Sequence, residues 1–143
     1  MIKKFWTNMM VRDLHKTIAF YRDTLDFEHI MSVPQDSEEI LSAYDDTRPL
    51  VYALVKNGDV ELMFQECESL KENVPTFDDV QNANTGGTLT FYFEVDDVDA
   101  LAERVKKDCP LIKDLHNTFY GMREVYVRDP NGYVLGFAQP LQR

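Results

Sequence analysis

Carboxylate and aromatic side chains recur at alternate positions in the most strand-like stretches of this 143-residue chain. Tyr92 and Glu94 are two residues apart, and so are Glu124 and Tyr126. Because successive side chains of a strand point to opposite faces, residues two apart share a face. A carboxylate accepts hydrogen bonds from amines, and the face of an aromatic ring attracts a cation. The spacing therefore indicates a surface suited to a planar or cationic organic molecule.

Two glutamates could also do proton-transfer chemistry. Glu61 and Glu124 each lie in a strand-like stretch among apolar residues. Loss of water there would raise the pKa of a carboxyl toward the range of a general base. The competing interpretation is that the carboxylates pair with arginines such as Arg12, Arg123 or Arg128. The sequence leaves both interpretations open.

Other familiar sources of chemistry are missing from the sequence. There is no Ser-His-Asp order, no phosphate-binding glycine-rich loop and no GxGxxG motif. The two cysteines, Cys67 and Cys109, form no CxxC pair, and the sequence leaves open whether they are reduced or joined. The carboxylates and aromatic residues remain as the candidates for function.

The elements that must position these side chains occur twice in the same order: strand, helix, strand, strand, strand. Each round opens with a strand, and an aspartate, Asp13 or Asp97, then caps the helix that follows. The predicted elements of the first round are 5–11, 14–25, 27–33, 50–56 and 59–65. Those of the second round are 88–95, 98–107, 111–114, 123–127 and 133–137.

Turn residues and polar stretches separate these elements. Asn57-Gly58 and Asp129-Pro130-Asn131-Gly132 have the residue types that tight turns require. Residues 34–48 are predicted to form a polar loop with one turn of helix around 37–43. We predict an α+β fold in one domain, with module one at about 1–67, a linker at about 68–87 and module two at about 88–143.

Composition limits the classes of partner. The formal net charge is −10 and the calculated pI about 4.6, which argues against nucleic acid and against anionic membrane surfaces. No apolar run is long enough to span a bilayer, and the first residues lack the pattern of a signal peptide. We therefore expect a cytoplasmic protein whose partner is a small molecule.

Four segments carry a family resemblance. They are residues 8–14 (NMMVRDL), 58–62 (GDVEL), 93–97 (FEVDD) and 129–132 (DPNG). In this order they resemble the vicinal oxygen chelate superfamily, which includes glyoxalase I, extradiol dioxygenases, fosfomycin resistance enzymes and bleomycin resistance proteins. The resemblance implies two βαβββ modules whose mixed sheets form a cleft, one helix packed on the back of each sheet, and a homodimer.

The resemblance also implies where a metal would be bound. The family's metalloenzymes place one His, Gln or Glu ligand on each of four strands, and the matching positions here are Trp6, Glu61, Thr90 and Gly136. Glu61 alone is a good ligand, and one carboxylate does not hold a catalytic metal. We therefore expect no metal and no cofactor. Gly136 is interpreted as a vacated ligand position that leaves room on the cleft floor.

Strand alternation and the resemblance together predict the residues that face the cleft. The loop before the last hairpin closes over the cleft in relatives, which adds two residues from 116–120. The predicted ligand-binding set is Trp6, Asn8, Met10, Glu61, Met63, Thr90, Tyr92, Glu94, His116, Tyr120, Glu124, Tyr126 and Gly136.

Three functions fit these residues. The first is a metal-free protein of the bleomycin-resistance type, which gives antibiotic resistance by sequestering a cationic or aromatic molecule. The second is a lyase, isomerase or dioxygenase-like enzyme that uses Glu61 or Glu124 as a general base of raised pKa or as a metal ligand. The third is a regulatory or partner-binding module without a small ligand.

Overall fold

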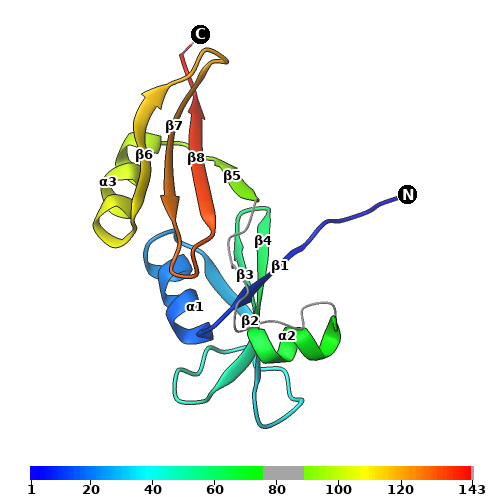
Figure 1. Ribbon diagram of the computed structural model, residues 1–143. Coiled ribbons are helices and arrows are strands. Elements are labelled where there is room, and N and C mark those ends of the chain that lie inside the picture. Colours follow the sequence, from blue (N-terminus) through cyan, green and yellow to red (C-terminus); the bar gives the residue numbers. More distant parts are fainter. Residues whose placement is uncertain (76–88, 143) are drawn as a thin grey trace. The chain divides into compact units, whose positions relative to one another are not determined.

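The computed structural model describes residues 1–75 and 89–142, which belong to two compact units (Figure 1). Unit 1 is Met1–Ala83 and unit 2 is Asn84–Arg143. Most of the predicted linker, residues 76–87, and the predicted strand start at residue 88 lie outside the described residues. Each unit is described by itself below.

Unit 1 contains one four-stranded mixed sheet and two helices. Its elements are β1 (Thr7–Val11), α1 (Leu14–Asp23), β2 (Glu28–Pro34), β3 (Leu50–Asn57), β4 (Val60–Glu66) and α2 (Cys67–Asn73). The strand order is β1-β4-β3-β2, with β1 parallel to β4 and the other pairs antiparallel. The predicted cap is confirmed, because the Asp13 side chain accepts from the backbone N–H of Lys16.

Unit 2 repeats this topology. Its elements are β5 (Thr90–Glu94), α3 (Val98–Asp108), β6 (Leu111–Asn117), β7 (Met122–Arg128) and β8 (Val134–Pro140). The strand order is β5-β8-β7-β6, again with one parallel and two antiparallel pairs. In the β7–β8 turn the Asp129 carboxylate accepts from the backbone N–H groups of Asn131 and Tyr133, each at 2.8 Å. Gly132 takes the positive φ of 93° there. The predicted α+β fold with two mixed sheets is confirmed.

A helix packs on one face of each sheet, as the alternation of apolar residues predicts. In unit 1 the ring of Tyr21 on α1 lies 5.0 Å from that of Phe64 on β4, and both are fully buried. In unit 2 the buried face contains Val125 and Phe137, and α3 buries Val105. The opposite face of each sheet is therefore where polar side chains gather.

Two stretches differ from the sequence prediction in the kind of structure that they form. Helix α2 occupies the start of the stretch predicted to be linker, because Glu66 caps its first N–H groups and Cys67 and Leu70 are buried with Met10. Residues 37–43, all of them described, do not form the predicted helical turn. Their Leu41 instead exchanges backbone hydrogen bonds with Ser32 of β2, at 2.8 and 3.0 Å.

Strand β6 is longer than predicted. It continues to Asn117, which pairs with Arg123 of β7, so His116 lies on a strand instead of in the loop. Within residues 1–75 and 89–142, none of the helices has the length and apolar character needed to cross a membrane.

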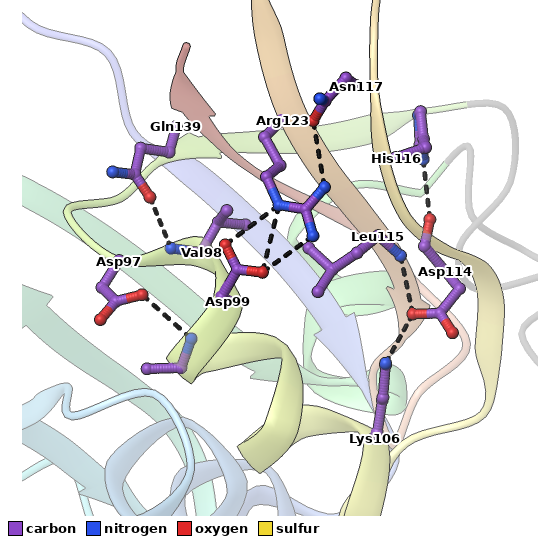
Figure 2. A network of polar contacts seen from close by, with 11 residues as sticks. Asp97, Val98, Asp99, Lys106, Asp114, Leu115, His116, Asn117, Arg123 and Gln139 are labelled. Carbon is purple, nitrogen blue, oxygen red and sulfur yellow. Dashed lines mark hydrogen bonds and ion pairs between the residues drawn. The ribbon is translucent and has the colours of Figure 1, made fainter. Parts of the chain in front are cut away.

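The cap of α3 gives a direct test of this fold. The Asp97 carboxylate accepts from the backbone N–H of Ala100 at 3.1 Å (Figure 2). We expect Asp97→Ala to lower the free energy of unfolding by about 0.5–2 kcal/mol, and Asp97→Asn to retain most of it. Urea unfolding would measure both, with the exposed neighbour variant Asp96→Ala as control. An equal loss in Asp97→Asn and Asp97→Ala would contradict the capping role.

Candidate functional site

A buried carboxylate lies at the centre of the candidate site in unit 2. The Glu124 side chain on β7 is only 3% exposed. Its Oε2 accepts a hydrogen bond from the Tyr92 hydroxyl at 2.6 Å, and its Oε1 accepts one from the Tyr120 hydroxyl at 2.8 Å. The same Oε1 lies 3.1 Å from Nε2 of His116. We call Tyr92, His116, Tyr120, Glu124 and Tyr126 the tyrosine–glutamate cluster.

Sheet register explains why these residues meet. Tyr92 on β5 and Tyr126 on β7 both pair with Gly136, which lies between them on β8. His116 on β6 pairs directly with Glu124. Directly paired residues share a face of the sheet, so four strands bring the cluster to the face opposite α3. The alternation in the sequence predicts this face correctly.

Gly136 is not a vacant position. A Cβ atom built on it would lie 2.6 Å from Cε1 of Tyr126 and 3.0 Å from Cδ1 of Tyr92. The first distance is shorter than real Cβ contacts and the second is tighter than most of them, so the space that a side chain would use is filled by the two rings. The prediction of free room on the floor at this glycine is therefore wrong. Glycine is present because the tyrosine rings pack directly on the backbone of β8.

The cluster holds a negative charge and keeps its hydroxyls protonated. Burial by itself raises the pKa of the Glu124 carboxyl, but the hydrogen bonds that it accepts outweigh burial and leave its pKa below the ordinary value. Burial, followed by the hydrogen bond to Glu124, raises the pKa of Tyr92. The hydrogen bond to Glu124 also raises the pKa of Tyr120. The raised pKa expected for a general base at Glu124 is therefore contradicted.

His116 faces two acceptors. Its Nδ1 lies 2.8 Å from the backbone oxygen of Asp114, and its Nε2 faces the Glu124 carboxylate. These two contacts hold the imidazole ring between the Asp114 carbonyl oxygen and the Glu124 carboxylate.

A second polar network fixes the strand segments that carry the cluster (Figure 2). Arg123 donates to both oxygens of Asp99 at 2.9–3.1 Å and to the Asn117 side chain at 3.0 Å, which joins β7 to α3 and β6. The Lys106 ammonium lies 2.6 Å from the Asp114 carboxylate. Arg123 thus pairs with Asp99, and the alternative interpretation that it neutralises Glu124 does not hold.

Unit 1 has a smaller site of related chemistry. The Trp6 Nε1 donates to Glu61 Oε1 at 3.3 Å, and the Lys4 ammonium contacts Glu61 Oε2. The same ammonium lies 4.4 Å from the centre of the Trp6 ring. The Lys4 hydrogen bond lowers the pKa of Glu61, so a general base of raised pKa is contradicted here too. A ring and a carboxylate of this unit therefore already hold one cation.

The remaining predicted residues are dispersed. In unit 1, Asn8 donates to Gln65 at 2.9 Å, Met63 is half-buried, and Met10 is buried beneath α2. In unit 2, Thr90 and Glu94 are exposed on β5. The structure brings together six predicted residues of unit 2 (Tyr92, His116, Tyr120, Glu124, Tyr126 and Gly136) and two of unit 1 (Trp6 and Glu61).

Sequence reasoning missed Lys4, although a signal for it was present. Lys4 precedes Trp6 by two residues, and this spacing places both side chains on one face of an extended segment. It also missed Gln65, which is buried and links Asn8 to Ser69 through a second hydrogen bond of 2.9 Å.

Each unit has the order βαβββ, with a helix on one face of its sheet and polar side chains on the other. The chain is therefore an α+β protein built from two repeated βαβββ modules. The chain belongs to the Glyoxalase/Bleomycin resistance protein/Dioxygenase superfamily, whose sequence profile matches residues 5–137. A comparison with curated proteins found no match.

Three solved structures of similar fold carry different names. A glyoxalase/bleomycin resistance protein/dioxygenase family enzyme from Burkholderia phytofirmans PsJN is 20% identical with a TM-score of 0.71, over 95% of this chain and 97% of that one. A protein of unknown function from Agrobacterium tumefaciens C58 is 22% identical with a TM-score of 0.69, over 99% and 97%. TioX from Micromonospora sp. ML1 is 16% identical with a TM-score of 0.67, over 97% and 99%. At these identities the likeness shows the fold alone.

The metal that this family implies does not fit the matching positions. Glu61 is engaged by Lys4 and Trp6, and Gly136 lies beneath two tyrosine rings. Trp6 offers an indole N–H, which is a donor and not a metal ligand. Across the described parts of the chain, no three His, Cys, Asp or Glu side chains are grouped so that they could hold a metal ion.

The packing at Gly136 gives a testable prediction. We expect Gly136→Ala to lower the free energy of unfolding by about 1–3 kcal/mol, because its methyl group must displace the Tyr126 ring. Urea unfolding should show a much smaller cost of the same change in a Tyr126→Leu background, since the obstructing ring edge is gone. An equal cost in both backgrounds would show that the ring is not the obstacle.

The charge of Glu124 gives a prediction in acid. Its folded pKa lies below the ordinary value of 4.5, so the carboxylate stabilises the fold above about pH 4.5 and this contribution disappears as pH falls through the folded pKa. The stability difference between wild type and Glu124→Gln should therefore shrink from about pH 5 to about pH 3. Other paired carboxylates are present in both proteins and cancel in the difference. A difference that stays constant or grows in acid would refute this assignment.

Proposed function

We propose that this protein binds a small aromatic cation without a metal and acts by sequestering it, as a cytoplasmic homodimer that gives resistance to a toxic compound. The observation that carries the proposal is the buried Glu124 carboxylate, which accepts hydrogen bonds from the hydroxyls of two exposed tyrosines. A binding protein of this kind needs affinity for its ligand and no catalytic set.

The cluster combines the two features that attract an organic cation. Tyr92 is 46% exposed and Tyr120 is 55% exposed, so their rings are accessible while the carboxylate that their hydroxyls hold is buried. A cation over such a ring gains about 0.5–2 kcal/mol, depending on its desolvation. The buried charge adds an attraction that solvent screens only weakly.

The contact of Lys4 supports the same ligand chemistry. Its ammonium, the protein's own cation, lies over the Trp6 ring and against the Glu61 carboxylate. Unit 1 thus shows a cation bound by a ring and a carboxylate, the combination that the proposal assigns to unit 2.

The enzyme alternative has less support. A general base works best when its pKa lies near the working pH, and the pKa values of Glu61 and Glu124 are both lowered. The family description includes dioxygenases, but the residues at the ligand positions do not suit a metal.

Binding of two planar aromatic cations, berberine and proflavine, tests the proposal. We expect at least one to raise the unfolding midpoint and to give saturable binding by calorimetry. Glu124→Gln should weaken that binding about tenfold or more, which corresponds to 1.4 kcal/mol. Glu103→Gln, which removes an exposed carboxylate on α3 of the same unit, is the matched control and should leave binding unchanged.

Two further readouts on the purified protein complete this test. Metal analysis after growth in metal-supplemented medium should find only substoichiometric metal, and light scattering should give the mass of two chains. Stoichiometric metal would overturn the metal-free proposal. Failure of both cations to bind would favour a regulatory or partner-binding module.

A further inference from the structure

The acceptor capacity of Glu124 limits which cations the cluster can take. Oε1 already receives the Tyr120 hydroxyl and His116, and Oε2 receives the Tyr92 hydroxyl. A carboxylate offers about four acceptor positions, and this one is almost wholly buried. Three of these positions are taken, and the side chain is only 3% exposed, so an incoming N–H group reaches an oxygen only by moving one of the three donors aside.

Displacing a donor is unfavourable for two reasons. The displaced hydroxyl or imidazole loses a charge-assisted hydrogen bond. If that group stays buried without a partner, the complex is destabilised by about 1–3 kcal/mol. A primary ammonium ion that does not displace a donor loses water without gaining an acceptor, which is also costly. In both cases we expect the cluster to bind a cation with N–H groups weakly.

A cation without N–H groups avoids both costs. A quaternary ammonium ion needs no acceptor and interacts with ring faces and with the buried charge. The rings of Tyr92 and Tyr126, with centroids 6.4 Å apart, pack on Gly136, and the partly exposed Tyr120 joins them at Glu124. We propose that the tyrosine–glutamate cluster selects quaternary and other donor-free organic cations over primary ammonium ions. This selectivity rests on the proposed function and names the class of its ligand.

The site in unit 1 shows the opposite case. Glu61 receives one donor on each oxygen, from Trp6 and from Lys4, and its side chain is 14% exposed. Its second donor is itself a primary ammonium. The same chain therefore contains one carboxylate that accepts an ammonium ion and one that is almost wholly buried and already receives three donors.

Calorimetric titration with benzyltrimethylammonium, benzylammonium and benzyl alcohol tests the selectivity. These probes share one ring and differ in charge and in N–H groups. At about pH 7.5 we expect the quaternary ion to bind about tenfold or more tighter than the primary ion, a difference of 1.4 kcal/mol, and the neutral alcohol to bind most weakly. Binding at the cluster is defined by its loss in Glu124→Gln and its persistence in Glu61→Gln.

Two variants of Tyr120 separate the hydroxyl from the ring. Tyr120→Phe keeps the ring but frees one acceptor position on Glu124. Benzylammonium should therefore bind tighter, and the ratio of the affinities for the quaternary and the primary ion should fall. Tyr120→Leu removes the ring, and benzyltrimethylammonium should bind more weakly. Circular dichroism and unfolding curves would establish that both variants fold.

The outcomes distinguish this inference from the proposed function. If benzylammonium binds as tightly as benzyltrimethylammonium in a manner that depends on Glu124, the selectivity is wrong and cation binding stands. If neither benzyl cation binds, the selectivity fails, and the berberine and proflavine titrations decide whether the proposed function fails with it. An unchanged preference in Tyr120→Phe would also overturn the role of filled acceptors.

Discussion

The structure of unit 2 depends on keeping Glu124 charged while it is buried. A buried carboxylate is costly unless donors surround it, and here three side chains from β5, β6 and the β6–β7 connection supply those donors. This requirement orients Tyr92, and the rings of Tyr92 and Tyr126 together leave no room for a side chain at position 136. The buried charge is thus linked to the packing on β8 through Tyr92.

Each unit has a glutamate that accepts hydrogen bonds from an aromatic side chain, but the other groups that contact the glutamate differ between the units. In unit 1 a lysine balances the glutamate, and an indole ring lies beside both. In unit 2 two hydroxyls and one imidazole surround the glutamate, and none of the three is a lysine or arginine side chain. The repeated topology supplies equivalent strands, and the residue types placed on them decide which groups contact the carboxylate.

Two of the four positions at which the family resemblance places a metal ligand make aromatic contacts here. Trp6 supplies an aromatic ring. Gly136 has no side chain, so the rings of Tyr92 and Tyr126 pack on its backbone. Both residues therefore serve aromatic contacts and not metal coordination, which the same fold permits.

The sequence by itself determined the repeated strand-helix-strand-strand-strand order, the caps at Asp13 and Asp97 and the faces of the residues on β5, β7 and β8. These features are local: they depend on a period of two or 3.6 residues and on hydrogen bonds that reach three residues. Only the tertiary structure decided that Gly136 is covered by rings, that α2 buries Met10 and that the pKa of Glu124 is lowered. Each of these depends on side chains brought together by strand pairing or packing, as Tyr92 and Glu124 are across 32 residues of chain. Register and rotamers set those distances, and neither can be seen in the spacing of residues along one strand.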